Sequence, residues 1–380
     1  MRVYFDNAAT TKVRDEAIEA MNRVMGTVYG NPSSMHSFGR QANIELKNAR
    51  KNVAEAIGAD PENIYFTSGG TEANNWAISG AADKLKRKGK HIVTSAIEHS
   101  AVLDPIKKLE NQGWEVTYLA PDSEGHISVE AFSSALREDT VFASVMLVNN
   151  ETGVINPVGD YSREIRSKGQ STILHTDAVQ ALCKIPITAK TLGADLITIS
   201  SHKLHGPKGV GALFVNKSIK LTPLILGGSQ EESNRGGTEA LPAAVGFGEA
   251  ARLGSLELTI TAGAVCELRN YIKTQLQTEI PSVVFPGSDK SSPFILSISL
   301  PGYKSETLMT ALDSEGICVS RSAACKKGAR SRTLEAMQLK NDVIDGALRI
   351  SFSRYSTKEE ADYFIKILKT ASLTLLKPLS

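Results

Sequence analysis

A lysine and an aspartate, each placed directly after an apolar extended run, are the first residues that could do chemistry. Lys203 follows the run 196–199, in a loop that glycine and proline interrupt. A lysine amine that cannot easily reach water has a lowered pKa and can form a Schiff base with a carbonyl. Asp177 follows the run 172–176, where a carboxylate needs a partner such as a protonated pyridine nitrogen, as in pyridoxal phosphate enzymes. Taken alone, a surface lysine and a helix N-cap aspartate are the simpler explanations.

The segment 67–73 joins a short extended run to a helical pattern through two glycines and hydroxyl side chains. Backbone N–H groups at the start of a helix, together with the helix dipole, bind phosphate well. The segment has neither the P-loop spacing nor the dinucleotide-binding fingerprint. It therefore indicates a phosphate cradle, with an ordinary strand-to-helix turn as an equally good explanation.

The segment 320–332 places Cys325 among small and basic side chains. Positive neighbours lower the pKa of a thiol and favour the reactive thiolate. The alternative is an incidental surface thiol in a solvated basic loop. The remaining cysteines form no CxxC pair, and we expect them to be small buried hydrophobes without a disulfide framework. They are Cys183, Cys266 and Cys318.

Alternating helical and extended patterns between about 37 and 215 must position these residues. Helices are predicted at 37–57 and from 71 to about 88. Several extended runs are apolar without alternation, which is typical of strands buried on both faces of a mainly parallel sheet. The sequence thus predicts an α/β sheet covered on both faces by helices. The predicted strands are 64–67, 91–94, 114–119, 141–148, 172–176, 196–199 and 212–215.

The pattern changes after about Gly254, where we expect a smaller α+β domain. Helical and extended patterns still follow one another, but one extended run partly alternates between apolar and polar residues. The predicted helices are 259–279, 304–315 and 358–375, and the predicted strands are 294–300 and 347–353.

The composition is that of an ordinary globular protein. The chain has 380 residues, 41% hydrophobic and 22% charged, which excludes a disordered or fibrous chain and suggests about two domains. A formal net charge of +2 is too balanced for a protein whose main partner is nucleic acid. No apolar run approaches the ~20 residues of a membrane span, and the first residues do not read as a signal peptide. We therefore expect a cytoplasmic protein that binds neither membrane nor nucleic acid directly.

The ordered motifs together resemble the NifS/IscS-type cysteine desulfurases, pyridoxal phosphate enzymes of the class-V aminotransferase family. The resemblance implies the α/β fold type I: a large domain, 14–254, with a mainly parallel seven-stranded sheet, and a small α+β domain. The small domain would comprise 1–13 and 255–380 and carry the cysteine loop. The resemblance covers nearly the whole chain and rests on 4–11, 30–36, 68–75, 98–99, 148–153, 175–180, 200–203, 235–238, the cysteine loop and 349–354.

The resemblance assigns roles around pyridoxal 5'-phosphate. Lys203 would hold the cofactor as a Schiff base, and Asp177 would pair with its pyridine nitrogen. Gln180 would hydrogen-bond the phenolic oxygen of the ring, and His99 would stack on the ring and move protons. The phosphate would be held by Gly70, Thr71, Ser200 and His202.

The resemblance also implies substrate and partner sites, and no metal. Asn150 and Arg354 would bind the carboxylate of L-cysteine, with Arg354 forming a bidentate pair. Thr238 would complete the phosphate site of the other subunit, so a homodimer is expected. Cys325 would accept the sulfur as a persulfide.

The implied reaction converts L-cysteine to L-alanine and passes sulfur to an acceptor protein for iron–sulfur cluster assembly or tRNA thiolation. The sequence departs from the family at Arg321, Lys326 and Lys327 of the cysteine loop and at Gly236, so the acceptor stays open. A selenocysteine lyase or another β-eliminating enzyme on the same fold is the alternative. An inactive cofactor-binding scaffold subunit is an alternative of another class, which the intact lysine, histidine and cysteine disfavour.

Overall fold

The computed structural model describes residues 1–322 and 330–375. Its largest element is a seven-stranded sheet in which β8 runs antiparallel to both neighbours and the remaining strands are mutually parallel. The prediction of a mainly parallel seven-stranded sheet is therefore confirmed. In spatial order the strands are β2 (Ile64–Thr67), β8 (Gly211–Val215), β7 (Leu196–Ser200), β6 (Ile173–Asp177), β5 (Thr140–Ser144), β3 (His91–Ser95) and β4 (Glu115–Leu119).

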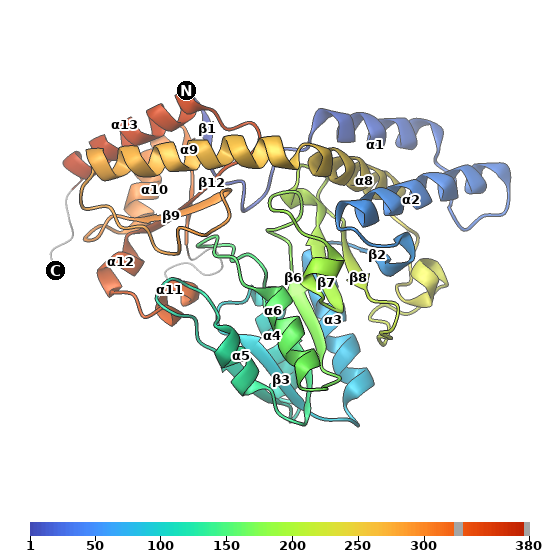
Figure 1. Ribbon diagram of the computed structural model, residues 1–380. Coiled ribbons are helices and arrows are strands. Elements are labelled where there is room, and N and C mark those ends of the chain that lie inside the picture. The colour runs from blue at the N-terminus through green and yellow to red at the C-terminus, as the bar shows by residue number, and fades with distance from the viewer. Residues whose placement is uncertain (323–329, 376–380) are drawn as a thin grey trace.

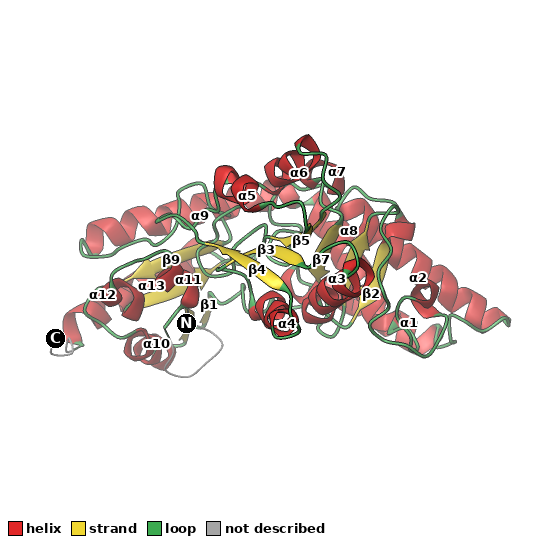
Figure 2. Cartoon of the chain, turned by 90° about the horizontal axis from the view of Figure 1, so that it is seen from below, coloured by secondary structure: helices red, strands yellow, loops and turns green. Residues whose placement is uncertain are grey.

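The central strands are apolar without alternation because both faces of the sheet are covered. Ile92 packs in one core cluster and the adjacent Val93 in another, as expected when successive side chains point to opposite faces. Figure 2 shows helices on both sides of these strands. They are α3 (Gly70–Leu85) and α4 (Ser100–Glu110) on one side, and α5 (Val129–Ala135), α6 (Val158–Ser167) and α7 (Ala189–Leu192) on the other.

The strand expected at 141–148 is shorter in the structure. β5 ends at Ser144, and the buried residues beyond it continue alongside β6: the Val145 N–H donates to the His175 carbonyl and the Leu147 N–H to the Asp177 carbonyl. The apolar pattern predicted correctly that these residues are buried, but the buried segment extends beyond the last residue of the regular strand.

Three helices pack together at one end of the large sheet (Figure 1): α1 (Asp15–Thr27), α2 (Ser37–Ala56) and α8 (Leu241–Leu256). The apolar positions predicted for α2, including Ala42, Leu46 and Val53, are buried. A Cβ at Gly248 would lie 2.7 Å from the Ala49 Cα, so only glycine allows α2 and α8 to approach this closely.

The C-terminal part has its own core. β11 (Ser320–Arg321), β12 (Ala347–Ser351) and β9 (Ile295–Ser299) form an antiparallel sheet, and β1 (Val3–Tyr4) pairs in parallel with β10 (Ile317–Cys318). The core cluster here joins Val3 and Phe5 to residues between 265 and 368, so the first residues of the chain pack with its C-terminal part. The division into 14–254 and 1–13 with 255–380 stays a prediction. Its helices are α9 (Leu258–Glu279), α10 (Ser305–Ser314), α11 (Arg332–Ala336), α12 (Asn341–Asp345) and α13 (Lys358–Thr374).

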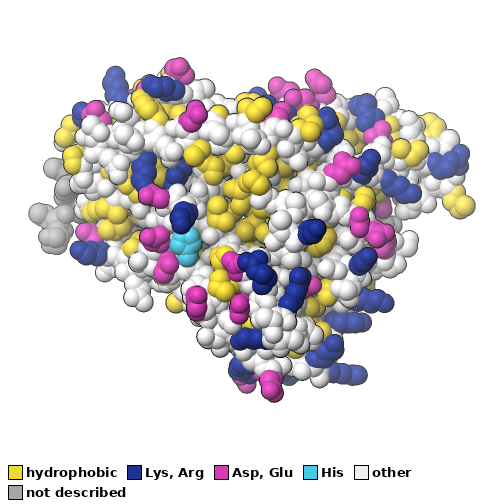
Figure 3. Space-filling model, viewed as in Figure 1, with side chains coloured by type: hydrophobic (Ala, Val, Ile, Leu, Met, Phe, Trp, Pro, Cys, Tyr) yellow, Lys and Arg dark blue, Asp and Glu magenta, His cyan; other side chains and the backbone are white. Residues whose placement is uncertain are grey.

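Acidic and basic side chains are interspersed over the face drawn in Figure 3, in keeping with the nearly balanced formal charge. Within residues 1–322 and 330–375, none of the helices combines the length and the apolar composition that crossing a bilayer requires.

Candidate active site

A cavity of about 350 Å³ lies where β6 and β7 end, next to the first turns of α3 and α4. Ligands of open parallel sheets bind at this carboxyl edge. Most of the residues singled out in the sequence meet here, although they come from segments far apart in the chain. Those lining the cavity are Gly70, Thr71, His99, Asn150, Asp177, Gln180, Ser200, His202 and Lys203.

Lys203 ends the short 3-10 helix η2 (Ser201–Lys203), which follows β7 directly. Its Nζ donates hydrogen bonds to the carbonyl oxygens of Ala8, at 2.6 Å, and Ala9, at 2.8 Å. Burial, and then the positive charge of Arg349, lower the pKa of the Lys203 amine to about 8. A substantial fraction of the amine is therefore neutral near physiological pH, as a nucleophile requires.

Asp177 is the last residue of β6, and only 5% of it is exposed. Asn74 donates to its Oδ2 at 2.7 Å, and the Val179 N–H donates to its Oδ1 at 3.0 Å. Each carboxylate oxygen keeps a lone pair after these bonds. The side chain is thus fixed in place and can still accept from a cationic donor in the cavity.

His99 is the N-cap of α4, and its Nδ1 accepts a hydrogen bond from the Ala101 N–H at 3.1 Å. Burial lowers the pKa of the ring, and the positive charges of Lys203 and Arg332 add to this against the opposing effect of Asp177. In the neutral ring the accepting Nδ1 leaves the proton on Nε2. His99 therefore offers an N–H donor at the cavity.

The start of α3 is built to receive an anion. Its first residue, Gly70, has no room for a side chain, because a Cβ would lie 2.9 Å from Val179 Cγ2. The hydroxyl of Ser200 is buried there without any hydrogen-bond partner. An unpartnered hydroxyl beside the N–H groups of a helix start fits a phosphate group. His202 lies beside them, and burial lowers its pKa to about 4, so it is neutral.

Arg354 does not line this cavity. Its Nη1 forms an ion pair with Glu257 Oε2 at 2.5 Å. Arg349 of β12 lines the cavity instead, donating from Nη1 to the Asn150 carbonyl and from Nη2 to Asp6 Oδ1, both at 2.9 Å, while its Nε has no partner. The sequence did contain a signal for Arg349, since a charged residue inside an apolar strand needs a partner.

Glu98 is a second residue that sequence reasoning did not single out. It lines the cavity, and Ser95 Oγ donates to its Oε1 at 2.5 Å and the Met146 N–H at 2.8 Å. Its Oε2 has no partner. Burial raises the pKa of this carboxyl to about 8, and the nearby Asp177 contributes in the same direction. Glu98 is therefore a neutral acid at physiological pH.

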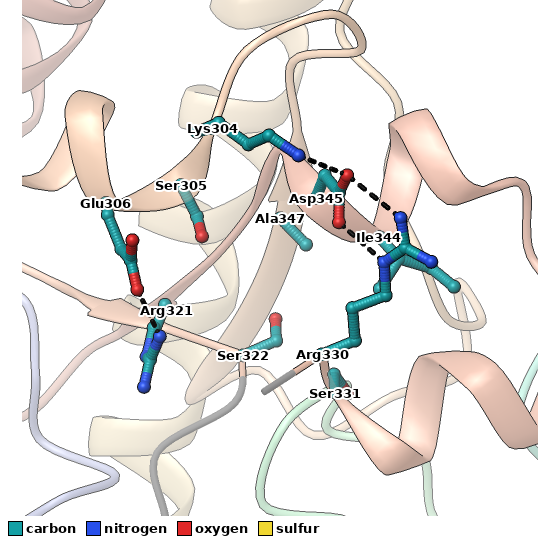
Figure 4. A pocket seen from close by; sticks show the side chains of 10 residues that line it. All are labelled: Lys304, Ser305, Glu306, Arg321, Ser322, Arg330, Ser331, Ile344, Asp345 and Ala347. Carbon is teal, nitrogen blue, oxygen red and sulfur yellow. Dashed lines mark hydrogen bonds and ion pairs between the residues drawn. The ribbon is translucent and has the colours of Figure 1, made fainter. Parts of the chain in front are cut away.

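Besides Arg354, one more described residue of the prediction, Thr238, is not brought into the cavity. Thr238 is exposed and does not line it. Cys325 lies outside the described residues, but Ser322, shortly before it in the chain, lines both the main cavity and a smaller one of about 210 Å³. Figure 4 shows Ser322 and Arg330 at this smaller cavity, where Arg330 pairs with Asp345 at 2.8 Å. Ser322 and Arg332, on either side of the undescribed residues 323–329, thus both line the main cavity.

Comparisons with known proteins agree on one family. The family model for class-V aminotransferases matches residues 3–364. The chain is 42% identical to "Cysteine desulfurase IscS" of Dictyoglomus turgidum, over 97% of this chain and 93% of that protein. A solved structure described as a NifS-like protein superposes with a TM-score of 0.94 and 38% identity, covering 99% of this chain and 100% of the other. Another, SspA in complex with cysteine, has a TM-score of 0.83 and 32% identity, covering 93% and 100%.

Proposed function

The chain belongs to the class-V aminotransferase family, and from that premise we propose that it is a pyridoxal-phosphate-dependent cysteine desulfurase. The main observation behind the proposal is the set of side chains that line one cavity. A lysine amine of lowered pKa, a buried carboxylate with free lone pairs and an unpartnered hydroxyl at a helix start all line it. Relatives named as cysteine desulfurases match nearly the full length of the chain, which supports this activity over others on the same fold.

The residues of the cavity fit pyridoxal phosphate. Lys203 would bind the aldehyde carbon, Asp177 the pyridine nitrogen and Gln180 the phenolic oxygen, with His99 against the ring. When bound, the cofactor supplies an electron sink for the negative charge that develops at the substrate Cα. The phosphate would be held by the α3 start and neighbouring donors: Gly70, Thr71, Ser200 and His202.

Arg349 replaces Arg354 in our proposal for the site that binds the substrate carboxylate. Its guanidinium lines the cavity, its unpartnered Nε is a buried donor, and its Nη1 holds the backbone of Asn150. Guanidinium and carboxylate pair with two parallel hydrogen bonds, which orients the substrate as well as binding it. Asn150 would add an amide donor to the same carboxylate.

We assign proton transfer to Lys203 and His99. The amine of Lys203, with a pKa of about 8, would be a suitable base for the Cα proton of cysteine. His99 carries its exchangeable proton on Nε2 and can return a proton when the product forms. The lowered pKa of Lys203 makes a neutral amine available near neutral pH, and the lowered pKa of His99 keeps its ring neutral there.

Sulfur transfer is assigned to Cys325. Its thiolate attacks the sulfur of the substrate, the carbon–sulfur bond breaks with its electron pair left on the substrate carbon, and a proton then completes L-alanine. Cys325 retains the sulfur as a persulfide for an acceptor protein. Ser322 and Arg332, described residues before and after Cys325 in the chain, line the cavity, which supports this assignment.

A homodimer is part of the proposal. Large apolar side chains are exposed around α1, α2 and the loop before Thr238, and the rings of Tyr29 and Phe38 lie 5.4 Å apart. Thr238 itself is exposed, so it is available to a partner subunit. The exposed apolar residues include Met25, Tyr29, Met35, Phe38 and Leu226.

The activity is tested by loading the protein with pyridoxal phosphate and measuring alanine release from L-cysteine, with dithiothreitol as sulfur acceptor. We expect a visible absorbance band and catalytic alanine release, both lost in Lys203→Ala and kept in the exposed-lysine control Lys190→Met. Alanine from L-selenocysteine but not from L-cysteine would favour the lyase alternative. Cofactor binding without any turnover would favour a scaffold subunit.

A further inference from the structure

A second buried lysine lies behind the wall of the cavity. Lys184, in the turn after β6, is only 5% exposed, and its Nζ donates to Gln180 Oε1 at 2.8 Å. Among the residues described, it forms no ion pair with an acid. The nearby Glu257 is already held by Arg14, at 3.1 Å, and by Arg354. Burying a lysine without an acidic partner lowers the stability of the fold, so the hydrogen bond of Lys184 to an amide alone needs a functional or structural reason.

The contact fixes the orientation of the Gln180 side chain. Its oxygen accepts from Lys184, and its Nε2 donates to the Ala8 carbonyl at 2.9 Å. An ammonium group only donates and a carbonyl only accepts, so both neighbours require the same orientation of the amide. One Nε2 hydrogen is used by Ala8, and the other is left for an acceptor in the cavity that Gln180 lines.

The same contacts link the two lysines. Lys203 and Gln180 donate to one acceptor, the Ala8 carbonyl, and Lys184 holds Gln180 from behind. We propose that Lys184 is a positioning residue that acts through Gln180: it keeps an amide N–H of Gln180 turned into the cavity. The wall formed by Gln180 then favours an anionic oxygen. Resting on the proposed function, that oxygen is the phenolate of bound pyridoxal phosphate.

The charge of Lys184 depends on what the main cavity holds. Burial lowers its pKa to about 7, and the positive charges of Lys203 and Arg349 add to the effect, against a small opposing effect of Cys183. Arg14, His205, Glu257 and Arg354 line the small cavity on its other side. An anion in the main cavity would favour the charged form of Lys184, so the lysine and such a ligand stabilise each other.

The test uses the holoenzyme and follows the visible absorbance of the Lys203 Schiff base as pH is raised through neutrality. A hydrogen bond from Gln180 to the phenolic oxygen favours the Schiff base that has lost its proton. Lys184→Met no longer fixes the orientation of Gln180, and the loss of this hydrogen bond should raise the midpoint of the titration by about one pH unit. Lys184→Arg, which keeps the charge and the donor, should stay close to the wild type, as should the control Lys190→Met.

A double-mutant cycle tests whether the effect passes through Gln180. Gln180→Leu should raise the midpoint as Lys184→Met does, and the double variant should show no further rise. An unchanged midpoint in Lys184→Met, or single shifts that simply add, would overturn the inference. If Lys184→Met does not fold, Lys184→Gln replaces it. The amide of the new glutamine can donate or accept, so it no longer fixes the orientation of the Gln180 amide. The titration midpoint of this variant must therefore also rise. Failure of the proposed function is distinguishable, since the wild type would then bind no cofactor or release no alanine.

Discussion

Glu98→Gln should make the protein more resistant to unfolding as pH rises. The carboxyl of Glu98 is 2% exposed, and burial raises its pKa from 4.5 to about 8. Between these two pH values the folded protein keeps a proton on Glu98 that the unfolded chain has lost. Stability therefore falls as pH rises through this window, because the unfolded state binds fewer protons. Glutamine has the same shape and no ionisable proton, so the stability of the variant does not fall with pH for this reason.

The size of the effect follows from the pKa change. Each pKa unit corresponds to about 1.4 kcal/mol, so the loss approaches about 5 kcal/mol once pH exceeds both pKa values. Urea unfolding of wild type and Glu98→Gln at equal protein concentration, below and above the window, measures it. The other ionisable groups are common to both proteins and largely cancel in the difference.

The stability difference between variant and wild type should become more favourable to the variant by several kcal/mol on going from acidic to basic pH. Glu138→Gln, which replaces an exposed glutamate, is the matched control and should show almost no such change. A change below about 1 kcal/mol for Glu98→Gln would mean that Glu98 ionises as an exposed acid does, and the account of a neutral acid in the cavity would be wrong.

Three further predictions concern the site and the assembly. Arg349→Lys should raise the KM for L-cysteine by about tenfold or more, because lysine cannot form the bidentate pair, whereas Arg354→Lys should change KM little; equal effects would reject our preference for Arg349. Gly70→Ala should weaken pyridoxal phosphate binding about tenfold, since its Cβ would lie 2.9 Å from Val179 Cγ2, while Gly26→Ala, which meets nothing within 4 Å, should bind normally in the same fluorescence titration. Light scattering should give twice the monomer mass, and a fully active monomer would contradict the proposed role of Thr238.

The helices and strands of the fold could be predicted from the sequence because the residue patterns that indicate them are local. The apolar runs that became β3, β6 and β7 and the periodic pattern of α2 depend on burial, which composition records directly. No expectation was formed for α1 or for α8, where the close approach of Gly246 to Met21 and of Gly248 to Ala49 appears only in the fold. The pairing of β1 with β10 joins Val3 to Ile317 and Tyr4 to Cys318, which lie far apart in the sequence, and no local pattern predicts it.

A site residue could be predicted from the sequence where its type and its position at the end of a strand together indicate a function. Lys203 and Asp177 were found in this way, and the structure places both in one cavity. Arg349 and Lys184 were not singled out, because the roles that we propose for them depend on distant partners, Asn150 and Gln180, that only the fold brings near. Arg354 was favoured from the motif, but its ion pair with Glu257 could not be seen in the sequence.

The most direct test of the account is the location of the sulfur after a single turnover. The cofactor-loaded protein is mixed with L-cysteine without reductant, and its peptides are examined by mass spectrometry while alanine is measured. The account predicts one added sulfur atom on the peptide that contains Cys325, alanine in the same amount, and neither in Cys325→Ser. A persulfide on the Cys318 peptide instead, or alanine release that continues in Cys325→Ser, would contradict it.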